Sequence, residues 1–110
     1  MGAMVYEGAL VLEFEDRLLR HLEHVMVTRL RRNEPFAFKW EQKPSGGEES
    51  HGTVWVSTAT SLQFRYAGPR RVEKLNRHWI EALIQSTYQP VGLVAVPEPA
   101  EPPAAPRRRE

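Results

Sequence analysis

The sequence has no cysteine, one aspartate, three lysines and no long apolar run. The absence of cysteine excludes disulfides and thiolate metal ligands. No stretch approaches the roughly 20 apolar residues that are needed to cross a bilayer. The first residues also lack the basic and apolar regions of a secretory signal. We therefore expect a cytoplasmic protein that has no membrane partner.

Motifs for catalysis are also missing. The four histidines do not form the His-Glu-x-x-His pattern of zinc enzymes, and no Gly-x-Ser-x-Gly elbow offers a nucleophile. Glu13, Glu15 and Asp16 cluster where a strand should give way to a helix, and capping of that helix accounts for them. The sequence therefore predicts no metal site, no cofactor and no catalytic residue. It favours a protein that is not an enzyme.

The composition is sufficient for one small domain. The 110 residues are 41% hydrophobic, which suits a single modest core. The formal net charge is only +1, so a uniformly polycationic nucleic-acid binder is not indicated. Any electrostatic function would require local clustering of charge.

Hydrophobic periodicity outlines the first half of the chain. Residues 4–14 alternate as a strand, in which Glu7-Gly8 is either the tight turn of a hairpin or a bulge. Residues 15–32 have apolar side chains at helical spacing, and Pro35 ends this helix. Residues 36–42 alternate again as a strand.

Two further strands are predicted at residues 52–57 and 61–66. Their alternation puts Trp55, Gln63 and Arg65 on a common face of the sheet. If that face is open to solvent, an aromatic ring beside cations can stack bases and hold phosphates. The alternatives are that a helix or a further strand covers Trp55, or that a single amphipathic Trp simply lies at the edge of the sheet.

The strongest helix signal begins at Gly68-Pro69 and runs to about Thr87. Asn76 falls near the centre of its apolar stripe, where the side chain either ties down a neighbouring segment or faces a ligand. Cations are unfavourable at a helix N-terminus by roughly 0.3–1 kcal/mol each. The cations in the first turns therefore either serve a bound anion or form a solvated face. They are Arg70, Arg71, Lys74 and Arg77.

Residues 92–96 form a short apolar strand, and a Pro/Ala-rich tail follows. Together these elements predict an α+β fold, in which an antiparallel sheet of four to six short strands carries two helices on one face. Residues 1–97 make a single domain, and residues 98–110 make a disordered tail that ends in Arg-Arg-Arg.

The chain resembles a family of small, uncharacterised actinobacterial proteins. The resemblance covers nearly all of the chain except residues 46–50 and the tail. It rests on an N-terminal Met-Gly-x-x-x-Tyr-x-Gly followed by Glu13-Phe14-Glu15-Asp16-Arg17-x-Leu19-x-His21-Leu22, Leu30-Arg31-Arg32-x-Glu34-x-Phe36-x-Phe38-x-Trp40, Leu62-x-Phe64-x-Tyr66, Leu75-Asn76-Arg77-x-Trp79-Ile80-Glu81-Ala82-Leu83 and Gly92-Leu93-x-x-Val96-Pro97-Glu98-Pro99.

Such relatives often carry the label "ATP-dependent DNA ligase", and the resemblance implies a link to DNA metabolism. A covalent nucleotidyltransferase requires a lysine in a Lys-x-Asp-Gly context. Lys39, Lys43 and Lys74 are followed by Trp-Glu, Pro-Ser and Leu-Asn, so none of them fits. The resemblance therefore implies no catalytic residue.

The leading functional hypothesis is a module that binds nucleic acid or another polyanion by neutralising phosphates. Trp55 is a candidate for stacking and Asn76 a candidate for facing the ligand. A protein–protein adaptor or homodimer is the alternative, and an accessory role in DNA ligation or repair is a more remote one. The candidate anion contacts are Arg31, Arg32, Arg65, Arg70, Arg71, Lys74 and Arg77.

Overall fold

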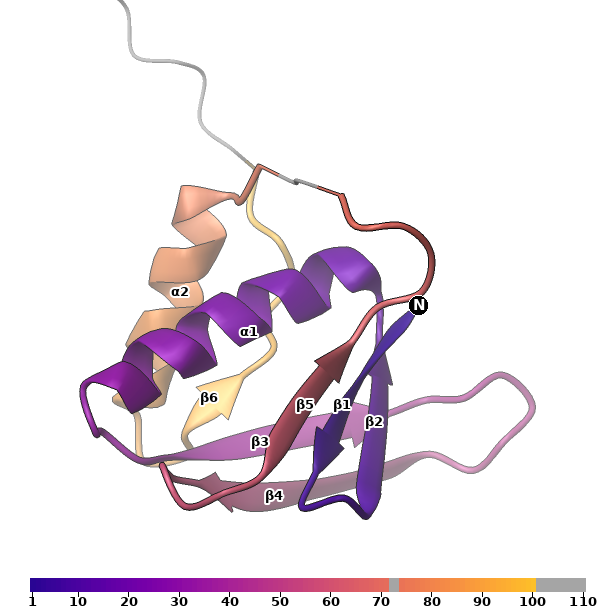
Figure 1. Cartoon of the computed structure of the whole chain (residues 1–110), viewed down its shortest axis with the longest axis horizontal. Coiled ribbons are helices and arrows are strands. Elements are labelled where there is room, and N and C mark those ends of the chain that lie inside the picture. The colour runs from indigo at the N-terminus through magenta and orange to yellow at the C-terminus, as the bar shows by residue number, and fades with distance from the viewer. Residues whose placement is uncertain (72–73, 101–110) are drawn as a thin grey trace, which may run out of the picture.

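The structure is a computed structural model that describes residues 1–71 and 74–100. Two helices and six strands lie in this part of the chain, which confirms the α+β class (Figure 1). The elements are β1 (Gly2–Tyr6), β2 (Leu10–Phe14), α1 (Asp16–Arg31), β3 (Phe36–Gln42), β4 (Ser50–Val56), β5 (Leu62–Arg65), α2 (Arg77–Thr87) and β6 (Leu93–Val94).

The first two strands form a hairpin, so the turn predicted at Glu7-Gly8 is present and the bulge is not. Glu7 and Gly8 have φ angles of 54° and 67°, and the Ala9 N–H donates to the Tyr6 carbonyl at 3.1 Å. Positive φ at both central residues is typical of the turn that matches the twist of a two-stranded hairpin.

The six strands form two three-stranded sheets, with the orders β2-β1-β5 and β4-β3-β6. β6 is parallel to β3, whereas the other pairs are antiparallel. The turn between Ser57 and Thr60 leads the chain from β4 in one sheet to β5 in the other. Trp55 therefore does not share a sheet face with Gln63 and Arg65, which corrects the arrangement expected from a single sheet.

Gln42 joins the two sheets through its side chain. Its Oε1 accepts the Glu13 N–H at 2.9 Å, and its Nε2 donates to the Glu13 carbonyl at 3.0 Å. The carboxamide thus makes the pair of bonds to β2 that a neighbouring strand would otherwise make.

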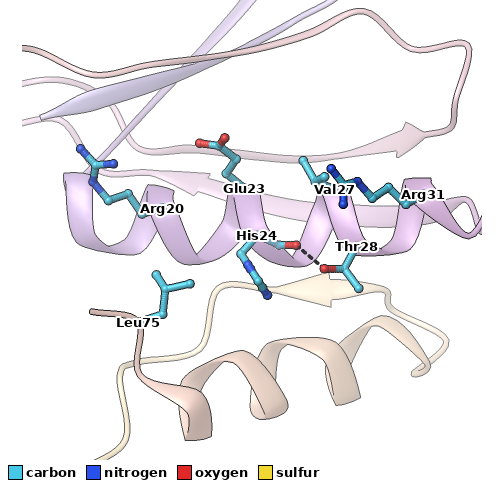
Figure 2. A pocket seen from close by; sticks show the side chains of 7 residues that line it. All are labelled: Arg20, Glu23, His24, Val27, Thr28, Arg31 and Leu75. Atoms are coloured by element: carbon cyan, nitrogen blue, oxygen red, sulfur yellow. Dashed lines mark hydrogen bonds between the residues drawn. The ribbon is translucent and has the colours of Figure 1, made fainter. Parts of the chain in front are cut away.

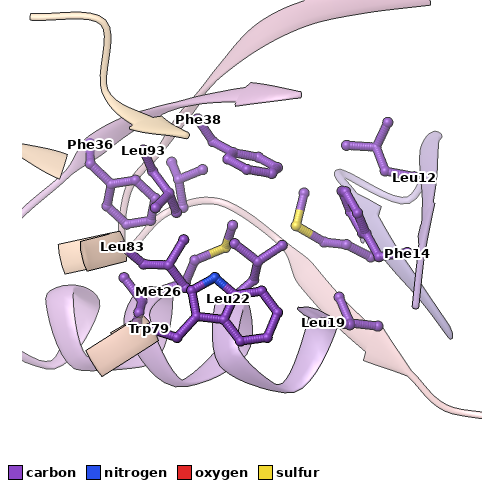
Figure 3. Close-up of a cluster of buried hydrophobic side chains, with 13 residues drawn as sticks. Leu12, Phe14, Leu19, Leu22, Met26, Phe36, Phe38, Trp79, Leu83 and Leu93 are labelled. Carbon is purple, nitrogen blue, oxygen red and sulfur yellow. The ribbon is translucent and has the colours of Figure 1, made fainter. Parts of the chain in front are cut away.

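The core lies between the helices and the inner faces of the sheets (Figure 3). α1 contributes residues at helical spacing and the strands contribute alternate residues, as the two periodicities require. The cluster consists of Met4, Leu12, Phe14, Leu19, Leu22, Val25, Met26, Phe36, Phe38, Val56, Trp79, Leu83 and Leu93.

The ends of α1 agree only in part with the capping expected from the sequence. Glu15 occupies the N-cap position, but its side chain makes no capping hydrogen bond, and Asp16 is the acidic residue of the first turn. Asn33 follows the helix with a φ of 55°, a conformation that asparagine tolerates better than most residues at a helix C-terminus.

α2 begins at Arg77, well after the predicted start at Gly68-Pro69. Asn76 has an extended backbone, and its Oδ1 accepts from the N–H groups of His78 and Trp79 at 3.0 and 3.3 Å. It is therefore the N-cap of α2 and not a residue of the apolar stripe. The segment between β5 and α2, residues 66–76, is hereafter the connector, of which residues 72–73 lie outside the described part.

The later start of α2 removes one argument for function. Arg70, Arg71 and Lys74 lie in the connector and not in the first turns of a helix. The unfavourable interaction with the helix dipole therefore does not apply to them. Of the four cations predicted for the first turns of this helix, only Arg77 lies in the first turn of α2.

Candidate anion-binding cleft

A cleft of about 460 Å³ runs along the side of α1 that is turned away from the core (Figure 2). Six of its residues come from α1, and Leu75 comes from the connector. The lining residues are Arg20, Glu23, His24, Val27, Thr28, Arg31 and Leu75.

Arg20 and Arg31 lie toward opposite ends of the cleft (Figure 2). They are eleven positions apart in one helix, which corresponds to about 16 Å along its axis. His24 lies between them, and the Thr28 hydroxyl donates to the His24 carbonyl at 2.7 Å. The hydroxyl is thus used within the helix, whereas His24 and Arg31 are exposed polar residues of the cleft.

Tyr66 supports the Arg20 end of the cleft. The Arg20 guanidinium carbon lies 4.3 Å from the centre of the Tyr66 ring, and the Tyr66 hydroxyl donates to Glu23 Oε1 at 2.7 Å. Burial and the hydrogen bond to Glu23 raise the pKa of Tyr66 above its ordinary value, so the hydroxyl keeps its proton at neutral pH. The stacked guanidinium is therefore held in a defined plane.

The connector runs beside the N-terminal half of α1. The Lys74 carbonyl accepts from Arg17 Nη1 at 3.3 Å, and the Asn76 N–H donates to His21 Nε2 at 2.8 Å. Leu75, between these two contacts, enters the cleft. The cations of the connector are thereby brought to the same end of α1 as Arg20.

The charges of the chain divide between two regions. Residues 15–32 and 66–81, which comprise α1, the connector and the start of α2, contain nine Arg or Lys and five Asp or Glu. Residues 1–14 and 33–65, which comprise five strands and their turns, contain three Arg or Lys and six Asp or Glu. The net charge of +1 therefore conceals a basic helical side and an acidic sheet side.

The predicted cations fall into two groups, all of them exposed. Arg31 and Arg32 lie at the C-terminal end of α1, and Arg31 lines the cleft. The second group belongs to the end of β5, the connector and the start of α2, and consists of Arg65, Arg70, Arg71, Lys74 and Arg77. Of the seven predicted cations, Arg31 is the one that lines the cleft, while the contacts of Lys74 and Asn76 hold the connector against the N-terminal half of α1.

Trp55 is 59% exposed, but it is not one of the residues that line the cleft. It pairs with Ala37 in the register of β3 and β4, and its neighbour Val56 is buried in the core. Because side chains alternate along a strand, Trp55 lies on the sheet face that is turned away from the core.

Asn76 is 2% exposed, and its carboxamide makes four hydrogen bonds within the chain. Besides the two capping bonds, Nδ2 donates to Glu98 Oε2 and to the Pro99 carbonyl, each at 3.0 Å. A carboxamide offers two donor and two acceptor positions. Asn76 therefore ties the C-terminal segment to α2 and has no position left for a ligand.

His21 completes this closed network. It is 1% exposed, its Nδ1 lies 2.7 Å from the Arg17 carbonyl, and its Nε2 accepts the Asn76 N–H. These partners require the neutral form with the proton on Nδ1. The ring also packs on Trp79, with 4.4 Å between ring centres.

Glu98 anchors the C-terminal segment from the other side. Its carboxylate accepts from Arg17 Nε and Nη2 at 2.8 and 2.7 Å. The hydrogen bonds from Arg17 and Asn76 lower the pKa of Glu98 from 4.5 to about 2. Contacts of the domain thus extend to Pro99, past the expected boundary at residue 97, and the tail from residue 101 lies outside the described part.

A larger cavity of about 1020 Å³ lies against β2, β3 and residues 94–98. Trp40 and Trp79 contribute aromatic surface, and charged residues of both signs line it. Arg17 is paired with Glu98 there, and Lys43 Nζ lies 4.0 Å from Glu41 Oε2. The cavity has no excess of positive charge, so it is a poorer candidate for an anion.

Arg20 and His24 belong to the cleft but were not among the predicted site residues. Their i, i+4 spacing on the polar side of the helix was the available signal. Most polar helix faces are solvated, so spacing alone did not distinguish this one. The decisive contribution comes from Leu75 and Tyr66, which reach α1 only in the folded chain.

The described residues contain no group of three or more His, Cys, Asp or Glu side chains that could hold a metal ion. Neither described helix is long and apolar enough to cross a membrane.

The family model for a domain of unknown function (DUF7882) matches residues 1–98. The chain belongs to this family. No curated protein and no solved structure matches the chain. The DUF7882 match ends at Glu98, the residue whose carboxylate closes the Arg17–Asn76 network.

Proposed function

We propose that this DUF7882 protein binds nucleic acid or another polyanion on the basic side formed by α1 and the connector. The observation that carries the proposal is the cleft, which has Arg20 and Arg31 at its ends and a second set of cations beside it. Concentration of positive charge on one side lets a protein of nearly zero net charge attract phosphates.

The chemistry that supports the proposal is neutralisation of phosphates and not the reading of base edges. Guanidinium groups match phosphate oxygens with two parallel hydrogen bonds. The cations come from a helix flank, a connector and strand and helix ends, and contacts of this kind fix position on a backbone without specifying sequence. The acidic sheet side would repel the same ligand and so orient the complex.

Salt dependence of binding tests the proposal directly. Fluorescence anisotropy of labelled single-stranded and duplex DNA should detect binding at roughly 50 mM salt and a steep loss by 200 mM. Neutralisation of about three phosphates predicts slopes near −2 for a single strand and −3 for a duplex in a plot of log K against log salt. Absence of binding at the lowest salt would refute the proposal.

Exposure of Trp55 supports a second candidate function, a protein–protein adaptor or homodimer. Trp55 is 59% exposed on β4, which is an edge strand of its sheet. Large exposed aromatic residues are enriched where proteins associate. Sedimentation or light scattering over a wide concentration range, with Trp55→Ser for comparison, tests this function. A constant monomeric mass for both proteins, with no partner retained, would exclude it.

We further propose that any role in DNA ligation or repair, as implied by the label on actinobacterial relatives, is accessory. Lys39 belongs to β3, Lys43 follows β3 and Lys74 belongs to the connector. None lies in a Lys-x-Asp-Gly context. Incubation with labelled ATP should give no covalent adenylate, and a labelled protein band would contradict this view.

A further inference from the structure

We infer that the cleft beside α1 is a seat for single-stranded nucleic acid, with His24 as the residue on which a base stacks. This inference rests on the proposed polyanion binding and goes further, because it distinguishes one class of polyanion from the others. A pure phosphate site requires cations only. The cleft also offers apolar and aromatic surface between its cations.

The residues in the middle of the cleft favour single-stranded nucleic acid over other polyanions. His24 and Val27 are exposed, Val27 at 37%, and Leu75 approaches from the connector. Figure 2 shows His24 on the helix between the two arginines, with Leu75 beside it. Bases of single strands stack on His and aromatic rings and on Arg guanidinium planes, while the backbone follows positive charge.

Tyr66 fixes the orientation of the Arg20 side chain. Its guanidinium lies on the Tyr66 ring at 4.3 Å, and Tyr66 is in turn hydrogen-bonded to Glu23. Holding the guanidinium in one plane lowers the entropy lost when a flat base or a phosphate meets it. Glu23 also lines the cleft, and its carboxylate moderates the positive charge at this end.

A duplex would use less of the same surface. Its base faces are covered by neighbouring base pairs, so only its phosphates would meet the arginines and His24 would gain no stacking partner. Inorganic polyphosphate or heparin would likewise use only the charge. The cleft should therefore rank a single strand above a duplex, and a duplex near these base-free polyanions, at equal salt.

The test compares three probes with the full chain at one salt concentration: a labelled single strand of about 16 nucleotides, the same sequence as a duplex, and heparin as competitor. Wild type should prefer the single strand by about tenfold. His24→Ala should lose about tenfold for the single strand, in line with the stacking contribution of one base, and should leave heparin binding unchanged. His24→Phe should restore the single-strand affinity, because a phenyl ring stacks without charge.

His51→Ala is the matched control, since His51 is an exposed histidine on β4 and does not line the cleft. It should leave all three affinities unchanged. Equal binding of all three probes, or equal losses for them in His24→Ala, would overturn the single-strand inference and leave the polyanion proposal intact. Failure of every probe to bind would overturn both.

Discussion

His21 and His24 lie one turn apart on α1 and belong to different kinds of site. His21 is buried in the network with Asn76, Arg17 and Glu98, where the polar groups are paired within the chain. His24 lies in the open cleft between Arg20 and Arg31. Polarity and burial alone therefore do not mark a functional site. Hydrogen-bonding capacity that the fold leaves available to a ligand is the better guide.

The largest effect is expected in the closed network. Asn76→Ala removes both capping bonds of α2 and both bonds to the C-terminal segment. It should lower the free energy of unfolding by about 2–3 kcal/mol, which combines loss of a cap with unpaired polar groups. Denaturation by urea measures this change, and His78→Ala, an exposed neighbour, is the control. Loss of oligonucleotide affinity without loss of stability would instead make Asn76 a ligand contact.

The basic side formed by α1 and the connector should show the reverse behaviour, with a loss of binding and little loss of stability. Removing two charges in Arg31→Gln/Arg71→Gln should lower affinity for DNA about tenfold and reduce the salt slope by between one and two, because two phosphate contacts are lost. The free energy of unfolding should change by less than about 0.5 kcal/mol, since both side chains are exposed.

Lys39→Gln/Lys43→Gln removes the same charge from the acidic sheet side and is the matched control. It should alter DNA affinity less than twofold, whereas long-range attraction would weaken equally in both double variants. Equal losses would therefore show that overall charge, and not the basic side formed by α1 and the connector, determines binding.

The smallest effect is a pH dependence in the closed network. The pKa of Glu98 is lowered from 4.5 to about 2 by its bonds to Arg17 and Asn76. A lowered folded-state pKa stabilises the fold above the unfolded value, and that contribution disappears as pH falls through the folded value. Wild type should exceed Glu98→Gln in stability at pH 6, and the difference should shrink from about pH 4.5 toward pH 2.

The side chain of Glu98 is 32% exposed, so solvent will moderate the size of this difference. Thermal melts of both proteins between pH 3 and pH 7 measure it. A difference that stays constant across this range would mean that the Glu98 carboxylate has an ordinary pKa, and that its bonds to Arg17 and Asn76 do not favour the charged form.

Local patterns predicted the elements whose ends are decided locally. The apolar spacing of residues 15–32 predicted α1 to within one residue at each end, and the hairpin turn at Glu7-Gly8 was one of the two alternatives that the sequence left open. The start of α2 was misplaced, because Gly68-Pro69 is a strong local signal and the cap at Asn76 depends on His21, 55 positions away. Contacts across such distances leave no mark on local periodicity.

Only the clustering of positive charge around the cleft could be predicted from the sequence. Arg31 and the connector cations were identified as candidate anion contacts, but the helix dipole argument was wrong for Arg70, Arg71 and Lys74, because they precede α2. Glu98 was assigned to a tail because its neighbours are prolines, whereas Arg17, 81 positions earlier, holds it in the domain. In both places the missing information was which segment of the chain crosses α1.

The bridge from Gln42 to Glu13 has a consequence for aggregation. β2 is an edge strand, and Val11 beside its free edge is 54% exposed. An uncovered edge next to apolar side chains is a template for pairing with a strand of another molecule. The Gln42 carboxamide occupies the outward backbone groups of Glu13, so this side chain blocks the part of the edge next to Val11. We expect that substitution of Gln42 would lower the solubility of the protein more than the stability of its fold.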